Sequence, residues 1–154
     1  MTLFLILFAL LGPPGFIVLH TLIGVLLMPF YGIDQIRWSQ GAIEVIAKKS
    51  KDGKTRIWFQ PGAQTWGLII FYSSARGWGN AGLRVHERVH ILQTYLFGVV
   101  YPVTYLLFFG VLFVVIRDFW KAYRKIPWEI WAYSKQDKFN EGKLPGAWGS
   151  KKVA

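Results

Sequence analysis

Two long stretches without a charged side chain constrain this chain more than any other feature. Residues 3–30 and 95–116 are almost wholly apolar, and each is long enough for a helix to cross the hydrocarbon core of a bilayer. The 154-residue chain is 53% hydrophobic and 18% aromatic, yet it carries a formal net charge of +10. That combination is typical of a small integral membrane protein with one compact domain.

The first stretch predicts a membrane anchor over residues 1–30. The sequence Gly-Pro-Pro-Gly at positions 12–15 interrupts it, which favours a kinked span or a shallow hairpin. The stretch has neither a positively charged start nor a small-residue cleavage site before the basic region. We therefore expect a retained anchor and not a cleaved signal peptide.

The distribution of charge sets the expected topology. Residues 31–95 and residues 117–154 each hold nine basic and four acidic side chains. The positive-inside tendency places both segments on the cytoplasmic side, with the uncharged amino terminus outside. A single span through residues 95–116 would separate them, so the sequence favours a re-entrant apolar hairpin at about 95–116.

The expected hairpin has two arms. A first helix runs to about Tyr101, the chain turns at Pro102, and a second helix over residues 104–125 returns antiparallel to the first. The return arm would then end near the level of His86, so that residues after Pro127 fold back beside it.

Residues between the anchor and the hairpin predict a small sheet. An Asp-Gly turn within residues 50–54 and a Pro-Gly turn at 60–62 separate β-branched or aromatic runs. We expect a three-stranded antiparallel sheet, with strands at residues 42–47, 56–59 and 66–72. The fold class is thus an α+β membrane protein with a domain over 31–140, a short carboxy-terminal helix and a flexible tail over 141–154.

The composition also limits partners. Basic residues are dispersed, and neither a basic helix nor an aromatic RNA-binding signature is present, so we expect contact with anionic lipid headgroups and no nucleic acid. The chain contains no cysteine, which excludes disulfides and thiolate ligands. Any metal must be bound by histidine, carboxylate or water.

Residues 86–90 form the motif H-E-x-x-H, which holds two of the three histidines of the chain. On a helix, His86 and His90 share a face and can bind one Zn²⁺, while Glu87 faces a water on that metal. The alternative is a histidine pair on a packed or solvated face. Asn80 can cap the helix, and apolar residues recur at helical spacing through it: Leu83, Val85, Val89, Leu92 and Leu96.

A catalytic zinc site needs a third protein ligand. We expect Glu129, because it follows Pro127, which can start a helix, and lies among apolar residues where an unpaired carboxylate is costly. An ion pair between Glu129 and a nearby Lys or Arg is the competing interpretation. The other candidates for the third ligand are His20, Asp118, Asp137 and Glu141.

The segments at 86–93 and 127–133 resemble gluzincin-type zinc metallopeptidases, especially small membrane proteins with the patterns HExxHxxQ and Pro-x-Glu-x-x-Ala-Tyr. The resemblance covers about residues 60–135. It implies His86, His90 and Glu129 as zinc ligands, Glu87 as general base, and Ala132 as a small residue between two helices. The chain lacks the substrate-binding domain of the larger peptidases.

The expected activity is a membrane-anchored zinc metallopeptidase with its site near the cytoplasmic interface, acting on peptides or membrane proteins. Tyr133, one turn beyond Glu129, is the expected oxyanion stabiliser, with Tyr123 and Arg84 as alternatives. Residues 66–72 form the strand expected to pair with an extended substrate. Two alternative functions stay open: a non-enzymatic membrane scaffold or assembly protein, and a metallohydrolase acting on a lipid or a non-peptide amide.

Overall fold

The computed structural model describes residues 12–48 and 62–144. These residues form six helices and a four-stranded mixed sheet, which confirms the α+β class. The elements are α2 (Pro13–Tyr31), β1 (Ile33–Ser39), β2 (Ala42–Ala47), β3 (Ala63–Trp66), β4 (Ile69–Tyr72), α3 (Ala75–Gly79), α4 (Ala81–Phe97), α5 (Val100–Ile116), α6 (Phe119–Arg124) and α7 (Pro127–Asn140). Five predictions lie wholly or partly outside the described residues: the start of the anchor, the two sheet turns at 50–54 and 60–62, the strand at 56–59 and the flexible tail.

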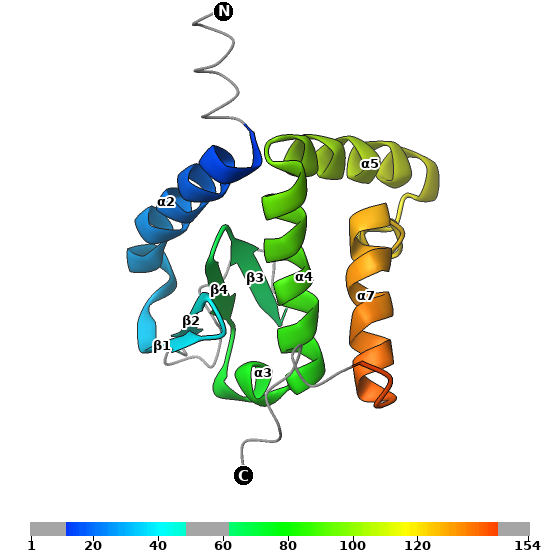
Figure 1. The fold of residues 1–154 in the computed structure, drawn as a ribbon. Helices are drawn as coiled ribbons and strands as arrows, with labels where there is room; N and C mark the ends of the chain where they lie inside the picture. Colours follow the sequence, from blue (N-terminus) through cyan, green and yellow to red (C-terminus); the bar gives the residue numbers. More distant parts are fainter. Residues whose placement is uncertain (1–11, 49–61, 145–154) are drawn as a thin grey trace, which may run out of the picture.

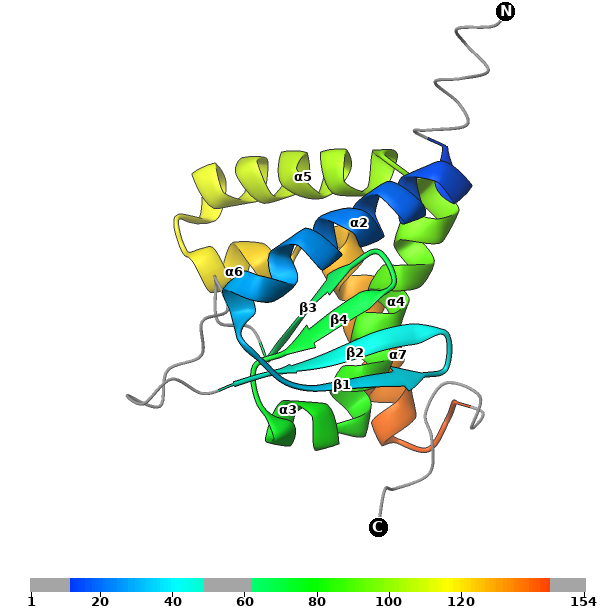
Figure 2. The same ribbon diagram turned by 90° about the vertical axis from the view of Figure 1, so that its left-hand side faces the viewer.

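The sheet lies between helices in a layered arrangement (Figures 1 and 2). Helix α2 covers one face, α4 covers the other, and α7 packs along the far side of α4. The central strand β4 is buried along its whole length, because helices cover both of its faces. This explains why its sequence, Ile-Ile-Phe-Tyr, is apolar at every position and does not alternate.

The strand order β1-β2-β4-β3 differs from the expected antiparallel meander. The prediction of three antiparallel strands is wrong, since β2 and β4 pair in parallel while β1–β2 and β3–β4 are antiparallel. Residues 48–62 join β2 to β3, and a connection of that length does not force the antiparallel pairing that a tight turn forces. The predicted strand at 66–72 is also broken, because Gly67 (φ 60°) turns the chain between β3 and β4.

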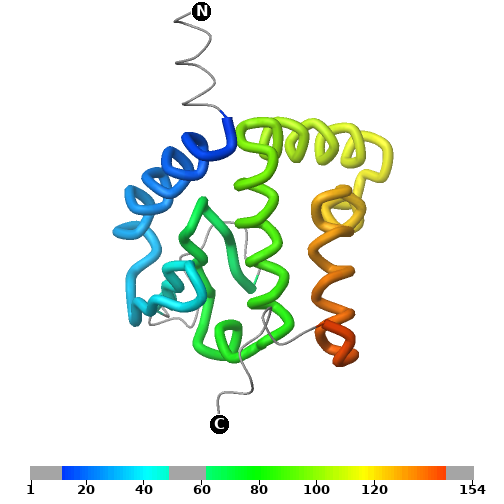
Figure 3. Tube along the Cα trace, in the orientation of Figure 1, coloured from blue at the N-terminus to red at the C-terminus, as the bar shows by residue number. Residues whose placement is uncertain are grey.

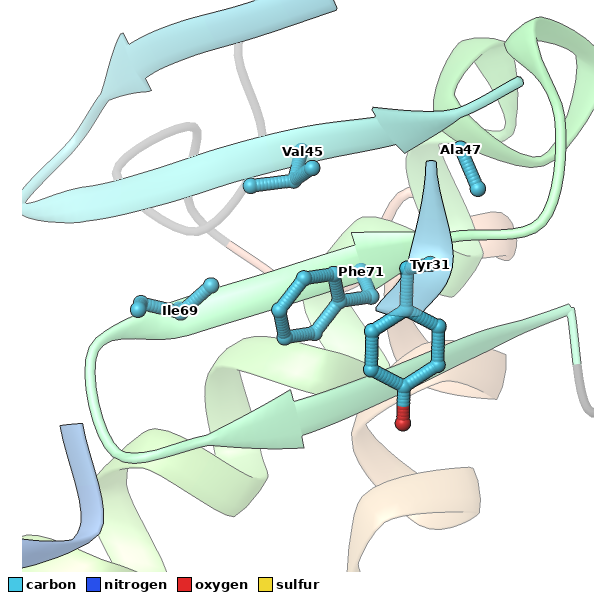
Figure 4. Close-up of a cluster of buried hydrophobic side chains, with 5 residues drawn as sticks. All are labelled: Tyr31, Val45, Ala47, Ile69 and Phe71. Atoms are coloured by element: carbon cyan, nitrogen blue, oxygen red, sulfur yellow. The ribbon is translucent and has the colours of Figure 1, made fainter. Parts of the chain in front are cut away.

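Alternate residues of the strands build two cores on the two faces of the sheet. The core under α2 contains Tyr31, Val45, Ala47, Ile69 and Phe71, and the ring of Tyr31 stacks on that of Phe71 with centroids 4.4 Å apart (Figure 4). The core on the other face, under α3 and α4, contains Ala42, Ala63, Ile70 and Tyr72.

Helix α2 is fixed to the β3–β4 turn. Thr21 Oγ1 accepts a hydrogen bond from the Leu68 backbone N–H at 2.9 Å, and the Tyr31 hydroxyl donates to Gln64 Oε1 at 3.0 Å. A Cβ on Gly67 would lie 2.4 Å from the Thr21 backbone nitrogen, so the helix and the turn are in direct contact. The outward side of α2 is exposed and apolar.

The apolar hairpin differs from its prediction (Figure 3). Helix α4 ends at Phe97 because Gly98 takes a positive φ, and the chain then bends by 116° into α5, which does not run antiparallel to α4. Pro102 lies inside the first turn of α5. Proline is tolerated there because backbone N–H groups in the first turn have no acceptor within the helix. The return helix predicted for 104–125 breaks at Arg117 (φ 56°), and the Asp118 side chain caps a separate helix, α6.

By length and composition, α2 is long and apolar enough to cross a membrane. Helices α4 and α5 meet the same test only as a bent pair, which fits a broken span or a re-entrant loop. The chain segment that returns alongside α4 is α7, which begins at Pro127 as the sequence predicts.

Candidate metal centre

Helix α4 presents two polar pairs to two different neighbours. The Asn80 side chain caps it by accepting the Leu83 backbone N–H at 3.0 Å, as expected. His86 and His90 lie one turn apart on the side facing α7, and Arg84 and Arg88 lie one turn apart on the side facing the sheet. All four side chains are buried.

The carboxylate of Glu129 on α7 lies between the two imidazoles. Its Oε2 is 3.2 Å from His86 Nε2, and its Oε1 is 3.3 Å from His90 Nε2. The two Nε2 atoms are 3.1 Å apart, and one ligand atom from each residue lies within 4.8 Å of the others. The structure thus brings together the three residues that the sequence predicts as ligands, and Ala132, fully buried on α7, lies one turn from Glu129.

The electrostatics of this group favour a negative charge on Glu129. Burial by itself would raise the pKa of Glu129, but the charge on His90 and the contacts with both imidazoles lower it. Burial would lower the pKa of His90, but the charge and hydrogen bond of Glu129, together with the charge of Glu87 and the hydrogen bond to Gln93, outweigh burial and raise the pKa to about 9. Glu129 is only 1% exposed, and its Oε2 accepts no hydrogen bond of good geometry. A buried acceptor beside two imidazole nitrogens fits the donor set of Zn²⁺.

Further side chains hold the candidate ligands in place. His90 Nδ1 donates to Gln93 Oε1 at 2.8 Å, and Gln93 Nε2 donates to the Trp128 carbonyl at 2.9 Å. This fixes the tautomer of His90, so that Nε2 is left to face Glu129 and His86. From α5, the Tyr101 hydroxyl lies 3.1 Å from His90 Nδ1, and the Tyr105 hydroxyl donates to Glu129 Oε1 at 2.8 Å.

Helix α5 contributes side chains to the site that the sequence motifs do not predict. Its only hydroxyl-bearing side chains are Tyr101, Thr104 and Tyr105, which are spaced to share one helix face. Thr104 completes the set by accepting the indole N–H of Trp128 at 3.1 Å. Three polar groups at helical spacing in an otherwise apolar helix were the available signal.

Glu87 borders a cavity beside the group of ligands. The Thr65 hydroxyl, from β3, donates to Glu87 Oε2 at 2.7 Å and so orients the carboxylate. The cavity has a volume of about 480 Å³, and His86 and Glu87 lie in its wall. The rest of the wall comes from the start of β3, the start of α4, and helices α6 and α7: Gly62, Ala63, Asn80, Leu83, Trp120, Tyr123, Arg124, Tyr133 and Gln136.

Two of the three predicted oxyanion candidates reach this cavity. The ring of Tyr133 packs edge-on against His86 with centroids 4.5 Å apart, and its hydroxyl interacts with Arg124. Burial raises the pKa of Tyr133, so its hydroxyl stays protonated and able to donate at neutral pH. Tyr123 also lines the cavity, whereas Arg84 is turned toward the sheet and pairs with Glu44.

The other candidates for a third ligand lie apart from the group. His20 packs against the rings of Phe16 and Trp66 under α2. Asp118 caps α6 and pairs with Lys121, and Glu141 pairs with Lys143 near the end of α7. Asp137 is exposed on α7. Among the described residues, the single group of three candidate ligands is His86, His90 and Glu129.

A second polar cluster fixes α4 to the sheet. Glu44 on β2 is fully buried and accepts hydrogen bonds from Trp78 Nε1 at 2.7 Å and from Arg88 Nη2 at 2.8 Å. Arg84 reaches the same carboxylate at 3.2 Å. The cluster therefore sets the rotation of α4, which turns His86 and His90 toward α7.

Comparisons of the chain with protein families, curated proteins and solved structures found no match. Any function assigned to this site therefore depends on its own residues and their geometry.

Proposed function

We propose that this protein is a membrane-associated zinc-dependent peptidase in which His86, His90 and Glu129 bind the metal. The observation that carries the proposal is the convergence of these three buried ligand atoms, from two helices, beside a cavity that Glu87 borders. Two imidazoles and one carboxylate are the protein ligands of known catalytic zinc sites, which keep a fourth position for water.

The chemistry divides among named side chains. Zn²⁺ bound by this set would lower the pKa of a water and polarise a substrate carbonyl. The Glu87 carboxylate, oriented by Thr65, would accept the proton of the attacking water and deliver it to the leaving amine. The protonated Tyr133 hydroxyl would donate a hydrogen bond to the developing oxyanion from the cavity wall.

An extended substrate would pair with β3. Of the described strands, β4 has neighbours on both sides and has no free edge, so most of the predicted pairing strand at 66–72 cannot serve. β3 stands at the end of the described sheet, its first residue Ala63 lines the cavity, and its Thr65 contacts Glu87. Backbone pairing there would lead a peptide past the site.

Metal content tests the first part of the proposal. The purified wild type should bind about one zinc per chain after reconstitution, and Glu129→Ala should lose most of that affinity. His20→Ala is the matched control, because it removes a buried histidine outside the group. A wild type that binds no zinc, or a Glu129→Ala variant that binds it unchanged, would contradict the proposed ligand set.

Glu87→Gln tests catalysis separately from metal binding. The amide keeps the size of the side chain and lies outside the ligand set, so zinc content should not change. Hydrolysis of a mixture of fluorogenic peptides should fall by at least 10²-fold, because the general base is lost. Equal hydrolysis by the wild type and Glu87→Gln would exclude this mechanism, and a non-catalytic role at a membrane would then be the better account.

A further inference from the structure

Apart from the face that carries Tyr101, Thr104 and Tyr105, helix α5 is apolar, and most of its side chains are exposed on the surface of the molecule. No Asp, Glu, Lys or Arg occurs between Arg88 and Arg117, and of the residues of α5 only Tyr101 is buried. Leu106, Val114 and Val115 are 70%, 72% and 75% exposed. A helix whose wide apolar surface is exposed is stable only when an apolar medium or a protein partner covers that surface.

A bilayer is the occupant that fits this surface. A protein partner would cover one face of α5, whereas acyl chains cover all exposed faces at once. The outward side of α2 adds a second apolar surface, since Val18 and Leu19 in its first turns are 59% and 44% exposed. These first turns lie at the same end of the molecule as α5 (Figures 1 and 2).

The segment that follows α5 has the composition of a headgroup contact. Residues 117–125 hold four basic side chains and one acid, together with Phe119, Trp120 and Tyr123. Trp120 is 50% exposed, and Asp118 is paired with Lys121. Aromatic rings and basic side chains next to an apolar helix are typical of the interface with anionic lipid.

This same segment forms one wall of the cavity at the proposed active site. Only Arg117 and Asp118 separate α5 from α6, and α6 contributes Trp120, Tyr123 and Arg124 to the cavity wall that also holds His86 and Glu87. The α6 wall of the cavity therefore lies within one short helix of the apolar surface. The second half of α7, which carries Lys135, Asp137 and Lys138, lies at the end away from α5 (Figure 1).

We propose that the α6 wall of the cavity lies in the headgroup layer of an anionic membrane, and that the site acts on polypeptides that are themselves attached to that membrane. The substrate part rests on the proposed peptidase function. The membrane position proposed for the cavity is inferred only from the surfaces of α5 and α6. The membrane position and the substrate class can therefore be contradicted by different experiments. A membrane-attached chain is held at the height of the cavity entrance, which raises its effective concentration there.

The absence of cysteine allows spin labels to be attached at single introduced cysteines. In phosphatidylcholine vesicles containing phosphatidylglycerol, a label at Leu107→Cys on α5 should be reached by oxygen and not by a water-soluble nickel chelate. A label at Trp120→Cys should show intermediate accessibility, and one at Trp38→Cys, an exposed tryptophan on β1, should be fully open to the chelate. Lys121→Cys, exposed and outside the cavity wall, reports the same depth if Trp120→Cys folds poorly.

Labels at positions 120 and 121 that are as open to the chelate as position 38 would overturn the proposal, whatever the zinc content. For the substrate, the zinc-loaded wild type in these vesicles is given one set of fluorogenic peptides with and without an amino-terminal palmitoyl chain. The anchored peptides should be cleaved at least tenfold faster than the free ones. Equal rates for both forms would overturn the substrate class, while loss of zinc binding would instead contradict the peptidase function and leave the label depths unchanged.

Discussion

At the scale of single residues, Gln93 has the most specific indirect role in the candidate metal centre. It is fully buried and links His90 on α4 to the Trp128 carbonyl on α7. Gln93→Leu should lower zinc affinity by 10–100-fold, because His90 loses the acceptor that fixes its tautomer. Competition with a chelating dye measures this, and Gln35→Leu on the exposed strand β1 is the control. Unchanged zinc affinity in Gln93→Leu would mean that packing alone orients His90.

Glu44 supports the site from the opposite side of α4. It is the buried carboxylate that Arg84 and Arg88 both contact. Glu44→Gln should lower the free energy of unfolding by about 3–5 kcal/mol, because two buried guanidinium groups lose their counter-charge. Thermal and denaturant unfolding in detergent measure this. Asp118→Asn is the comparison, since its exposed pair with Lys121 is screened by solvent and should contribute little to the free energy of unfolding. Equal effects of the two substitutions would contradict the assigned role of Glu44.

At the scale of elements, sequence patterns predict those that follow a local rule. Asn80 and the apolar spacing after it locate α4, and Pro127 locates the start of α7. Strand β1 is missed because most of its side chains are exposed, so no buried face imposes a pattern of period two. Local sequence patterns also do not predict the parallel pairing of β2 with β4, because this pairing depends on how α2 and α4 cover the two faces of the sheet.

The contact between α2 and the sheet turn predicts a difference between two glycines with positive φ. Gly67→Ala should destabilise the protein by more than the roughly 1–2 kcal/mol that a left-handed backbone costs an alanine, because its Cβ would collide with the Thr21 backbone. Gly41→Ala, where nothing lies within 4 Å of the added Cβ, should show the conformational cost alone. Unfolding free energies measure both. A Gly67→Ala variant no less stable than Gly41→Ala would show that α2 does not rest on this turn.

At the scale of the whole molecule, the residues of the candidate centre can be predicted from the sequence, whereas the chain path that brings them together cannot. The motif supplies His86, Glu87 and His90, and the proline-led segment supplies Glu129, so the residues that meet in the structure could be named in advance. The chain path between them differs from the predicted one. An antiparallel return helix was expected to set the height of Glu129, whereas α5 runs across the molecule and α6 turns the chain back into α7. Side chains in a motif constrain chemistry, but the path between two motifs depends on packing across the molecule.

Because the ligands come from α4 and α7, metal binding should stabilise the entire fold. A ligand that binds only the native state adds about 4 kcal/mol when its free concentration is 1,000 times its dissociation constant. For a chain of this size, that should raise the unfolding temperature by roughly 10 °C, which calorimetry in detergent with buffered zinc can measure. A variant with His86→Ala, His90→Ala and Glu129→Ala should gain nothing from zinc, whereas His20→Ala should gain as much as the wild type. The same gain in the triple variant would show that zinc binds elsewhere and that the two helices do not share it.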